Sequence, residues 1–269
     1  MKRGLLVAIA AVVLGLLLYP AFEAGGSKSP GAEFFCGFSV TPGDCGFSEQ
    51  AKVPGRATLV KIARAGGRGV RLRTEPGDHD VAGSGSAERN DLALSEAATG
   101  CREGAEQWWA HSVLFPDDYV APPQSRPGGA WHWGVVFSFH HSGSKGQANF
   151  HVDAMPDPIG LRLRGYGGER VDAGEYEVVL GPVQKNRWYD FVYHVRWSSG
   201  PDGFFNAWVN GVPKLAHYGP TLYAGQGCYL KLANYHTGFG KPSSVIHDRV
   251  VRASTPEAVA LTPLQGLRH

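Results

Sequence analysis

Side chains that could transfer protons gather on the predicted strand Trp131–His141 (WHWGVVFSFHH). With the two-residue period of a strand, one face is large and apolar and the other ends in a hydroxyl and an imidazole. The apolar face consists of Trp133, Val135, Phe137 and Phe139, and the other face of Val136, Ser138 and His140. Because an imidazole titrates near neutral pH, His140 is a candidate general base. We therefore expect this strand to form the floor of a binding groove.

A second predicted strand, Tyr229–Tyr235 (YLKLANY), brings two phenols and an ammonium to one face. Tyr229, Lys231 and Tyr235 alternate there with leucines on the opposite face. Tyr235 can donate a proton to a leaving oxygen, which makes it a candidate acid. Nearby cations would ease ionisation of its phenol, so Tyr235 is also an alternative base. The sequence leaves open which of His140 and Tyr235 is the base and which is the acid.

Alternating arginines supply further cations. Arg71 and Arg73 share one strand face, and Arg162 and Arg164 share another. A guanidinium group grips a carboxylate with two parallel hydrogen bonds, which suits an anionic sugar polymer. The predicted substrate-binding residues are Tyr229, Lys231, Arg71, Arg73, Ser138, Arg162 and Arg164.

Arg89 and Asn90 are candidates for the electrostatic part of the chemistry. One way to cleave an anionic sugar polymer is elimination, which removes the weakly acidic proton on the carbon next to a carboxylate and needs donors to offset the negative charge that develops. A guanidinium and an amide can do this, and Ser138 would add a hydroxyl. The predicted catalytic residues are His140, Tyr235, Arg89 and Asn90.

The elements that must position these groups are short strands. The chain has 37 Gly and 18 Pro among 269 residues, and turn signals separate most of the alternating segments. The predicted strands cover residues 57–62, 69–75, 106–115, 131–141, 149–153, 160–164, 188–197, 204–210, 212–215, 229–235 and 244–252. Residues 76–91 are predicted as a Gly/Ser-rich loop that closes at Glu88–Asp91. Without a βαβ pattern or a repeat, an all-β, two-sheet antiparallel β-sandwich of jelly-roll type follows.

The N-terminus has the pattern of an export segment. Lys2 and Arg3 precede an apolar run from Gly4 to Tyr19. We favour a signal peptide, with an uncleaved membrane anchor as the alternative, because the run is just long enough to span a bilayer. Residues 1–30 are therefore set apart from a domain at 31–269, which we expect to be secreted or periplasmic, and membrane-bound only if anchored. The net charge of +2 gives no reason to expect a nucleic-acid partner, and we expect a monomer.

Four cysteines fit an oxidising compartment. Three pairings are possible, and the short spacing favours Cys36 with Cys45, which leaves Cys101 with Cys228. No Cys/His spacing indicates zinc. Asp78 and Asp80 in the predicted loop are a weak signal for calcium, so we expect no metal or other cofactor.

Several motifs resemble one family of enzymes. The strings RLRTEPGDHDVAGSGSAERNDL, EGAEQWWAHSVLFPDDY, VVFSFHH, RWYDFVYHVRWSSGPDGFFNAWVNG and CYLKLANY occur in this order between residues 55 and 252. They are similar to segments of the heparin-lyase-I-like and glucuronan-lyase-like polysaccharide lyases. The resemblance implies a concanavalin A-like jelly roll that cleaves uronic-acid polymers by β-elimination.

The resemblance also implies roles for particular residues. His140 matches the family's groove histidine, Tyr235 its catalytic tyrosine and Lys231 a substrate-binding lysine, while Arg89 lies in the charged motif near the carboxylate site. Ser138 departs from the pattern, because many relatives carry glutamine two residues before that histidine. A shorter donor there weakens the inference for carboxylate neutralisation and leaves the polymer undetermined.

Other function classes fit less well. A retaining glycoside hydrolase would need two carboxylates about 5–5.5 Å apart. The strand pattern Glu-x-Asp-x-x-Glu is absent, and Glu175 and Glu177 lie in a Gly-rich, loop-like stretch. No Gly-x-Ser-x-Gly elbow indicates a serine hydrolase. The main alternative to a lyase is a non-catalytic carbohydrate-binding module on the same sandwich.

Overall fold

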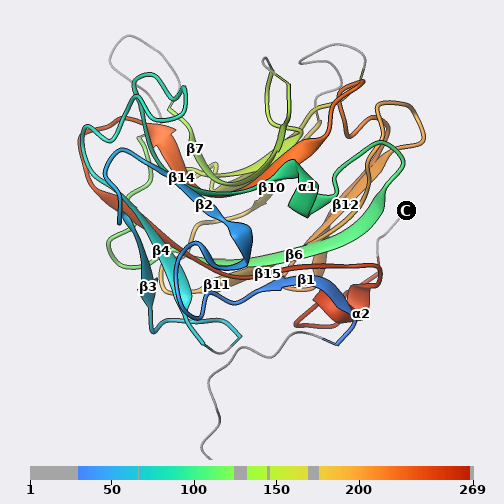
Figure 1. Cartoon of the computed structure of the whole chain (residues 1–269), viewed down its shortest axis with the longest axis horizontal. Coiled ribbons are helices and arrows are strands. Elements are labelled where there is room, and N and C mark those ends of the chain that lie inside the picture. Colours follow the sequence, from blue (N-terminus) through green and yellow to red (C-terminus); the bar gives the residue numbers. More distant parts are fainter. Residues whose placement is uncertain (1–29, 66, 124–131, 144–145, 169–175, 267–269) are drawn as a thin grey trace, which may run out of the picture.

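The computed structural model describes residues 30–65, 67–123, 132–143, 146–168 and 176–266. Two antiparallel sheets lie face to face (Figure 1), so the predicted all-β sandwich is confirmed. The predicted export segment, Trp131 and Glu175 lie outside the described residues. No helix among the described residues is long and apolar enough to cross a membrane.

One layer, here called the back sheet, has eight strands in the order β13-β12-β11-β6-β15-β4-β3, with β1 paired to β15. Its strands are β1 (Ala32–Cys36), β3 (Ala57–Val60), β4 (Gly69–Thr74), β6 (Glu106–Leu114), β11 (Trp188–Arg196), β12 (Phe204–Val209), β13 (Val212–Tyr218) and β15 (Ser243–Ala253). Short helical turns flank the sheets at η1 (Asp44–Gly46), α1 (Glu96–Thr99) and α2 (Pro256–Val259).

The other layer, here called the groove sheet, has seven strands in the order β10-β9-β8-β7-β14-β5-β2. Its strands are β2 (Ser48–Ala51), β5 (Ala87–Leu94), β7 (Gly134–His141), β8 (Phe150–Ala154), β9 (Leu161–Gly165), β10 (Tyr176–Gly181) and β14 (Cys228–Thr237). It forms the upper, curved layer in Figure 1, with loops rising above it on both sides.

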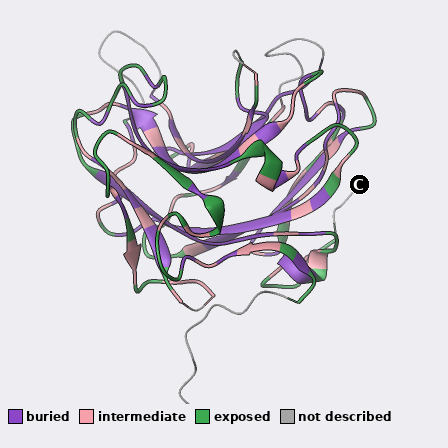
Figure 2. Cartoon of the chain, viewed as in Figure 1, coloured by how far each residue is buried: buried purple, intermediate pink, exposed green. Residues whose placement is uncertain are grey.

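The core between the sheets is largely aromatic. Phe139 and Phe150 of the groove sheet have ring centroids 5.0 Å apart, and Phe150 lies 4.2 Å from Phe205 of the back sheet, so the two sheets meet through tilted aromatic rings. Burying each such side chain contributes about 1.5–3 kcal/mol. Figure 2 shows the buried residues along both layers and the exposed residues mainly in the loops. The apolar faces predicted from alternation therefore hold the two sheets together.

One alternation prediction is wrong at β7. Val136 and Phe137 both pack in the core, and the pairing with β8 shifts register between Val135 and Phe137. This is a β-bulge, in which one extra residue in the strand makes the side chains before it point to the opposite face from the one that strict alternation predicts. Trp133 and Val135, which were expected in the core, consequently line the groove instead.

The predicted loop at Glu88–Asp91 is also wrong. These residues belong to β5, which is buried along its whole length next to β14. The sequence favoured a loop because the string is charged, but burial of charges in a strand is tolerated when they are paired. Strands β1, β2 and β10 were likewise not predicted.

Two local predictions are confirmed. Asn210 and Gly211 have positive φ angles of 52° and 78° and join β12 to β13, as expected of a two-residue hairpin turn. The disulfides are Cys36–Cys45 and Cys101–Cys228. The second bridge closes a long loop and reaches the first residue of β14, next to Tyr229.

Candidate active site

A groove of about 1010 Å³ lies on the face of the groove sheet that points away from the core. Its floor comes from β5, β7, β8, β9 and β14, because the residues that alternate with the apolar core face stand on this side. Of the predicted site residues, the structure brings eight to this groove. They are His140, Tyr235, Arg89, Lys231, Tyr229, Ser138, Arg162 and Arg164.

Strand register places these groups in rows across the sheet. In the central row, Lys231 on β14 lies opposite Ser138 on β7, Ser138 opposite His151 on β8, and His151 opposite Arg164 on β9. Toward one end, Tyr229 pairs with His140. The other end has a second long row, formed by Arg89, Tyr235, Val135, Asp153 and Arg162.

His140 and Tyr229 form the first end of the groove, with ring centroids 5.2 Å apart. His140 Nδ1 lies 3.0 Å from the carbonyl oxygen of His141. A carbonyl only accepts, so Nδ1 carries the proton and Nε2 is the nitrogen able to take one. Burial lowers the pKa of His140 to about 4, and burial raises the pKa of Tyr229. At neutral pH this end therefore offers a neutral imidazole beside a protonated phenol.

Lys231 extends this end of the groove. Its Nζ lies 5.6 Å from the centre of the Tyr229 ring and 3.4 Å from Oδ2 of Asp91. Burial lowers the pKa of Lys231, while the carboxylate of Asp91 opposes that change. The same oxygen of Asp91 lies 3.1 Å from Nε of Arg89. Two cations thus share one fully buried carboxylate, which leaves a net positive charge on the floor of the groove.

Arg89 and Tyr235 form the second end. The guanidinium carbon lies 3.8 Å from the centre of the Tyr235 ring, and Nη1 donates to the carbonyl oxygens of Val81 (3.3 Å) and Ala82 (3.1 Å). Trp133 packs edge-on against Tyr235 with centroids 4.5 Å apart. Burial raises the pKa of Tyr235 more than Arg89 lowers it, so the phenol is harder to ionise than usual. The expectation that nearby cations ease its ionisation is wrong in net direction.

The structure separates the predicted catalytic pair. His140 lies opposite Tyr229 on β14, and Tyr235 is six residues farther along that strand. Six residues of extended strand span about 20 Å between backbone positions, and the ring that His140 contacts is that of Tyr229. That His140 and Tyr235 act together therefore stays a prediction, while the contacts of the structure favour Tyr229 as the partner of His140.

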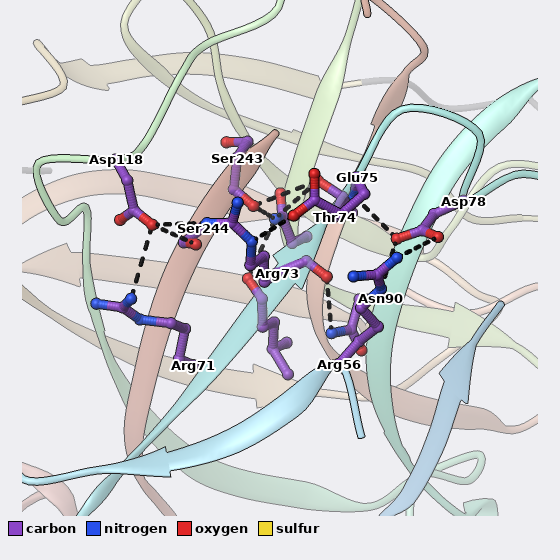
Figure 3. Close-up of polar contacts among 12 residues, drawn as sticks. Arg56, Arg71, Arg73, Thr74, Glu75, Asp78, Asn90, Asp118, Ser243 and Ser244 are labelled. Carbon is purple, nitrogen blue, oxygen red and sulfur yellow. Dashed lines mark hydrogen bonds and ion pairs between the residues drawn. The ribbon is translucent and has the colours of Figure 1, made fainter. Parts of the chain in front are cut away.

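Three predicted site residues lie outside the groove (Figure 3). Arg71 and Arg73 are on β4 of the back sheet, where both pair with Asp118, at 3.6 and 3.2 Å. Arg73 also pairs with Glu75 at 2.7 Å. Their alternation was predicted correctly, but the strand belongs to the other sheet, so the assignment to substrate binding is wrong.

Asn90 faces the opposite way from its neighbours on β5. Arg89 and Asp91 line the groove, and the fully buried amide of Asn90 donates to the carbonyl oxygen of Arg73 at 3.1 Å (Figure 3). Alternation along β5 requires this, since adjacent side chains point to opposite faces. Its prediction as a catalytic residue is therefore wrong, and its amide instead links the two sheets.

Sequence reasoning missed several groove residues. His151 and Asp153 alternate on β8, with His151 Nε2 3.5 Å from Oδ2 of Asp153. The same alternation that revealed Arg162 and Arg164 would have found them. Glu177, expected in a loop, is on β10 and pairs with Arg164 at 3.1 Å. Asp91 could be found only by recognising β5 as a strand.

The weak calcium signal has a different explanation. Oδ2 of Asp78 lies 3.1 Å from Nε of Arg56 and accepts the backbone N–H of Glu75 at 2.8 Å. Asp80 instead contacts His79. Across the described ranges, no group of three or more His, Cys, Asp or Glu side chains could hold a metal ion.

Comparison with known proteins identifies the family of this chain. A family model described as polysaccharide lyase matches residues 43–251. No curated protein sequence matches the chain. Endo-β-1,4-glucuronan lyase from the fungus Trichoderma reesei has a similar structure, with a TM-score of 0.65, 16% identity, and coverage of 85% of this chain and 98% of that one.

Two further structures show how widely the fold is shared. A variant of alginate lyase Aly36B in complex with alginate tetrasaccharide has a TM-score of 0.51 and 13% identity, and covers 87% of this chain and 98% of its own. The binding domain of botulinum neurotoxin DC has a TM-score of 0.52 and 7% identity, and covers 84% of this chain and 49% of its own. At such identities the likeness concerns the fold alone. The family-model match spans most of the sequence, and the chain belongs to the polysaccharide lyase family.

Proposed function

We propose that this polysaccharide lyase cleaves a uronic-acid polymer by β-elimination at the first end of the groove. The observation that carries the proposal is the contact of His140 with Tyr229, beside the ammonium of Lys231. An unprotonated imidazole, a protonated phenol and a cation are the three groups that elimination from a uronate needs. No other part of the described groove combines all three within such short distances.

In this mechanism, Nε2 of His140 takes the proton from the carbon next to the uronate carboxylate. Lys231 offsets the charge that develops on the carboxylate. The bond from the neighbouring carbon to the glycosidic oxygen then breaks, and Tyr229 gives its phenolic proton to the leaving oxygen. The products are one shortened chain with a free hydroxyl and one chain whose terminal sugar contains a carbon–carbon double bond.

The charge of the groove supports an acidic substrate. Its lining carries four cationic side chains, from Arg89, Lys231, Arg162 and Arg164, and two carboxylates, from Asp91 and Asp153. A concave surface of one sign attracts the opposite charge and raises its local concentration. The names of two structural neighbours, glucuronan lyase and alginate lyase, also refer to uronic-acid polymers. In this proposal, Arg89 and Tyr235 bind and stack on the polymer at the second end.

We also propose that the enzyme works outside the cytoplasm. The chain contains two disulfides, and in most proteins disulfides persist only in an oxidising compartment. A polymer too large to enter a cell would be met there. Whether the N-terminal segment is cleaved can be read from the N-terminal sequence of the exported protein.

The proposed function is tested with a panel of glucuronan, alginate and glycosaminoglycans, followed by the ultraviolet absorbance of the unsaturated product. We expect product from at least one polymer, and its loss in His140→Gln. His194→Gln is a matched control, since His194 is a half-buried histidine on the back sheet that lies outside the groove. Binding without product from any polymer would overturn the proposal and favour a carbohydrate-binding module.

A further inference from the structure

The edge of the groove sheet holds an ion-pair cluster that the proposed chemistry does not use. Arg162 and Arg164 on β9 lie between two acids, Asp153 on β8 and Glu177 on β10. Arg162 Nη2 is 2.8 Å from Asp153 Oδ2, and Arg164 Nε is 3.1 Å from Glu177 Oε2. The other oxygen of Glu177 lies 3.8 Å from Nη1 of Arg162, so this carboxylate contacts both arginines.

The two acids differ in burial. The Asp153 side chain is 2% exposed, and Arg162 donates to it from both Nε and Nη2. Burial alone would raise the pKa of Asp153, but the combined effect of His151 and Arg162 is larger and opposite. The pKa is therefore below its ordinary value, and the carboxylate stays ionised. The Glu177 side chain is 42% exposed and lies on the edge strand of the sheet. Asp153 is therefore a fixed counter-ion, whereas Glu177 is accessible to solvent and to a ligand.

Replacing Glu177 by another carboxylate at these arginines would cost little free energy, because the ion pair is partly exposed. Such pairs contribute about 0.2–1 kcal/mol, because water already solvates both charges well. A carboxylate from a ligand can make the same contacts with the guanidinium groups. Displacing Glu177 would also leave its own carboxylate in water, where it needs no partner.

We propose that Arg162 and Arg164 form a second carboxylate-binding subsite, which Glu177 occupies until a uronate carboxylate of the polymer displaces it. The proposal rests on the proposed function, since it assumes a substrate with carboxylates on more than one sugar. Three strand spacings, about 14 Å, separate Lys231 on β14 from Arg164 on β9 in the central row. The subsite therefore binds a different sugar from the one that is cleaved, and it selects polymers that carry more than one uronate.

Glu177→Gln tests this directly, because it removes the competing charge and keeps the shape of the side chain. We expect KM for long glucuronan or alginate oligosaccharides to fall by about 2- to 5-fold, the value of one exposed ion pair. The effect falls on KM rather than kcat, is absent for disaccharides that cannot reach β9, and shrinks at high salt. Asp202→Asn is the matched control, because it removes one acid from an exposed pair with Arg196 on the back sheet.

An unchanged or raised KM in folded Glu177→Gln would overturn the proposal, since it would show that Glu177 only orients the arginines. Arg164→Ala provides a second measurement, with a raised KM expected for long oligosaccharides alone. Binding of the same oligosaccharides, measured by calorimetry, separates this proposal from the proposed function. Tighter binding to Glu177→Gln without any turnover would support the subsite while rejecting the lyase mechanism.

Discussion

The two ends of the groove contain the same pairing of a phenol with a cation, but in different surroundings. At the first end, Tyr229 lies beside His140, whose Nε2 can accept a proton. At the second, Tyr235 packs between Trp133 and a guanidinium that two backbone carbonyls and Asp91 hold in place. A phenol next to an acceptor can take part in proton transfer, whereas the Tyr235 ring has a guanidinium over one face and an indole edge-on, with no imidazole of the described residues in contact, which suits binding of the polymer. The neighbours of the side chain, more than its type, distinguish the two ends.

The largest effect is expected from substitutions that test whether proton transfer takes place at the first end of the groove and not at the second. His140→Gln and Tyr229→Phe should each lower kcat by about 10²–10⁴, the usual contribution of a positioned acid or base. Tyr235→Phe should leave both kcat and KM nearly unchanged, because the ring that stacks on the polymer is kept. Initial rates on the best polymer of the panel measure both parameters, and thermal unfolding checks that each variant is folded. If Tyr235→Phe loses as much turnover as Tyr229→Phe, the distinction between the ends fails.

A second test removes the carboxylate that joins the two ends. Asp91 is fully buried between Lys231 and Arg89. Asp91→Asn leaves two buried cations without a counter-ion, so the free energy of unfolding should fall by about 3–5 kcal/mol. Urea denaturation gives this value, and Asp202→Asn, at an exposed pair with Arg196, should leave the free energy of unfolding nearly unchanged. A small loss in Asp91→Asn would mean that burial keeps Asp91 protonated in the native enzyme.

The pH profile gives a third, smaller effect. Because burial lowers the pKa of His140 to about 4, the base is unprotonated at all higher pH values. Activity should therefore fall only as pH drops through about 4, and not near the ordinary histidine value of about 6.5. The raised pKa of Tyr229 predicts that its proton is retained in mildly alkaline solution. An acid limb of kcat/KM near 6.5, in protein that circular dichroism shows to be folded, would contradict this environment for His140.

The smallest effect is expected outside both ends. Arg71 lies on the back sheet with Asp118, so Arg71→Ala should leave KM and kcat unchanged and alter stability by about 0.5 kcal/mol or less. Steady-state kinetics with a long oligosaccharide measure this beside Arg164→Ala. A raised KM in Arg71→Ala would show that the polymer contacts the back sheet, and the groove would then not be the whole binding surface.

Much of the fold could be predicted from the sequence, because alternation of side chains is a local property. The faces of β4, β9 and β14 were predicted correctly, and so were the hairpin at Asn210 and both disulfides. Strand β5 was missed because its charged residues resemble a loop. Their burial becomes acceptable only when Lys231 on another strand pairs with Asp91.

Two arginine pairs show what the sequence alone determines and what it leaves to the tertiary structure. Arg71 with Arg73 and Arg162 with Arg164 have the same spacing, and each pair does share one face of its strand. Only the order of strands decides that the first pair is on the back sheet and the second in the groove. Register and the bulge at Val136 likewise decide that His140 meets Tyr229 and not Tyr235. Both depend on contacts between residues far apart in the chain, which the packing of the two sheets selects and no single strand encodes.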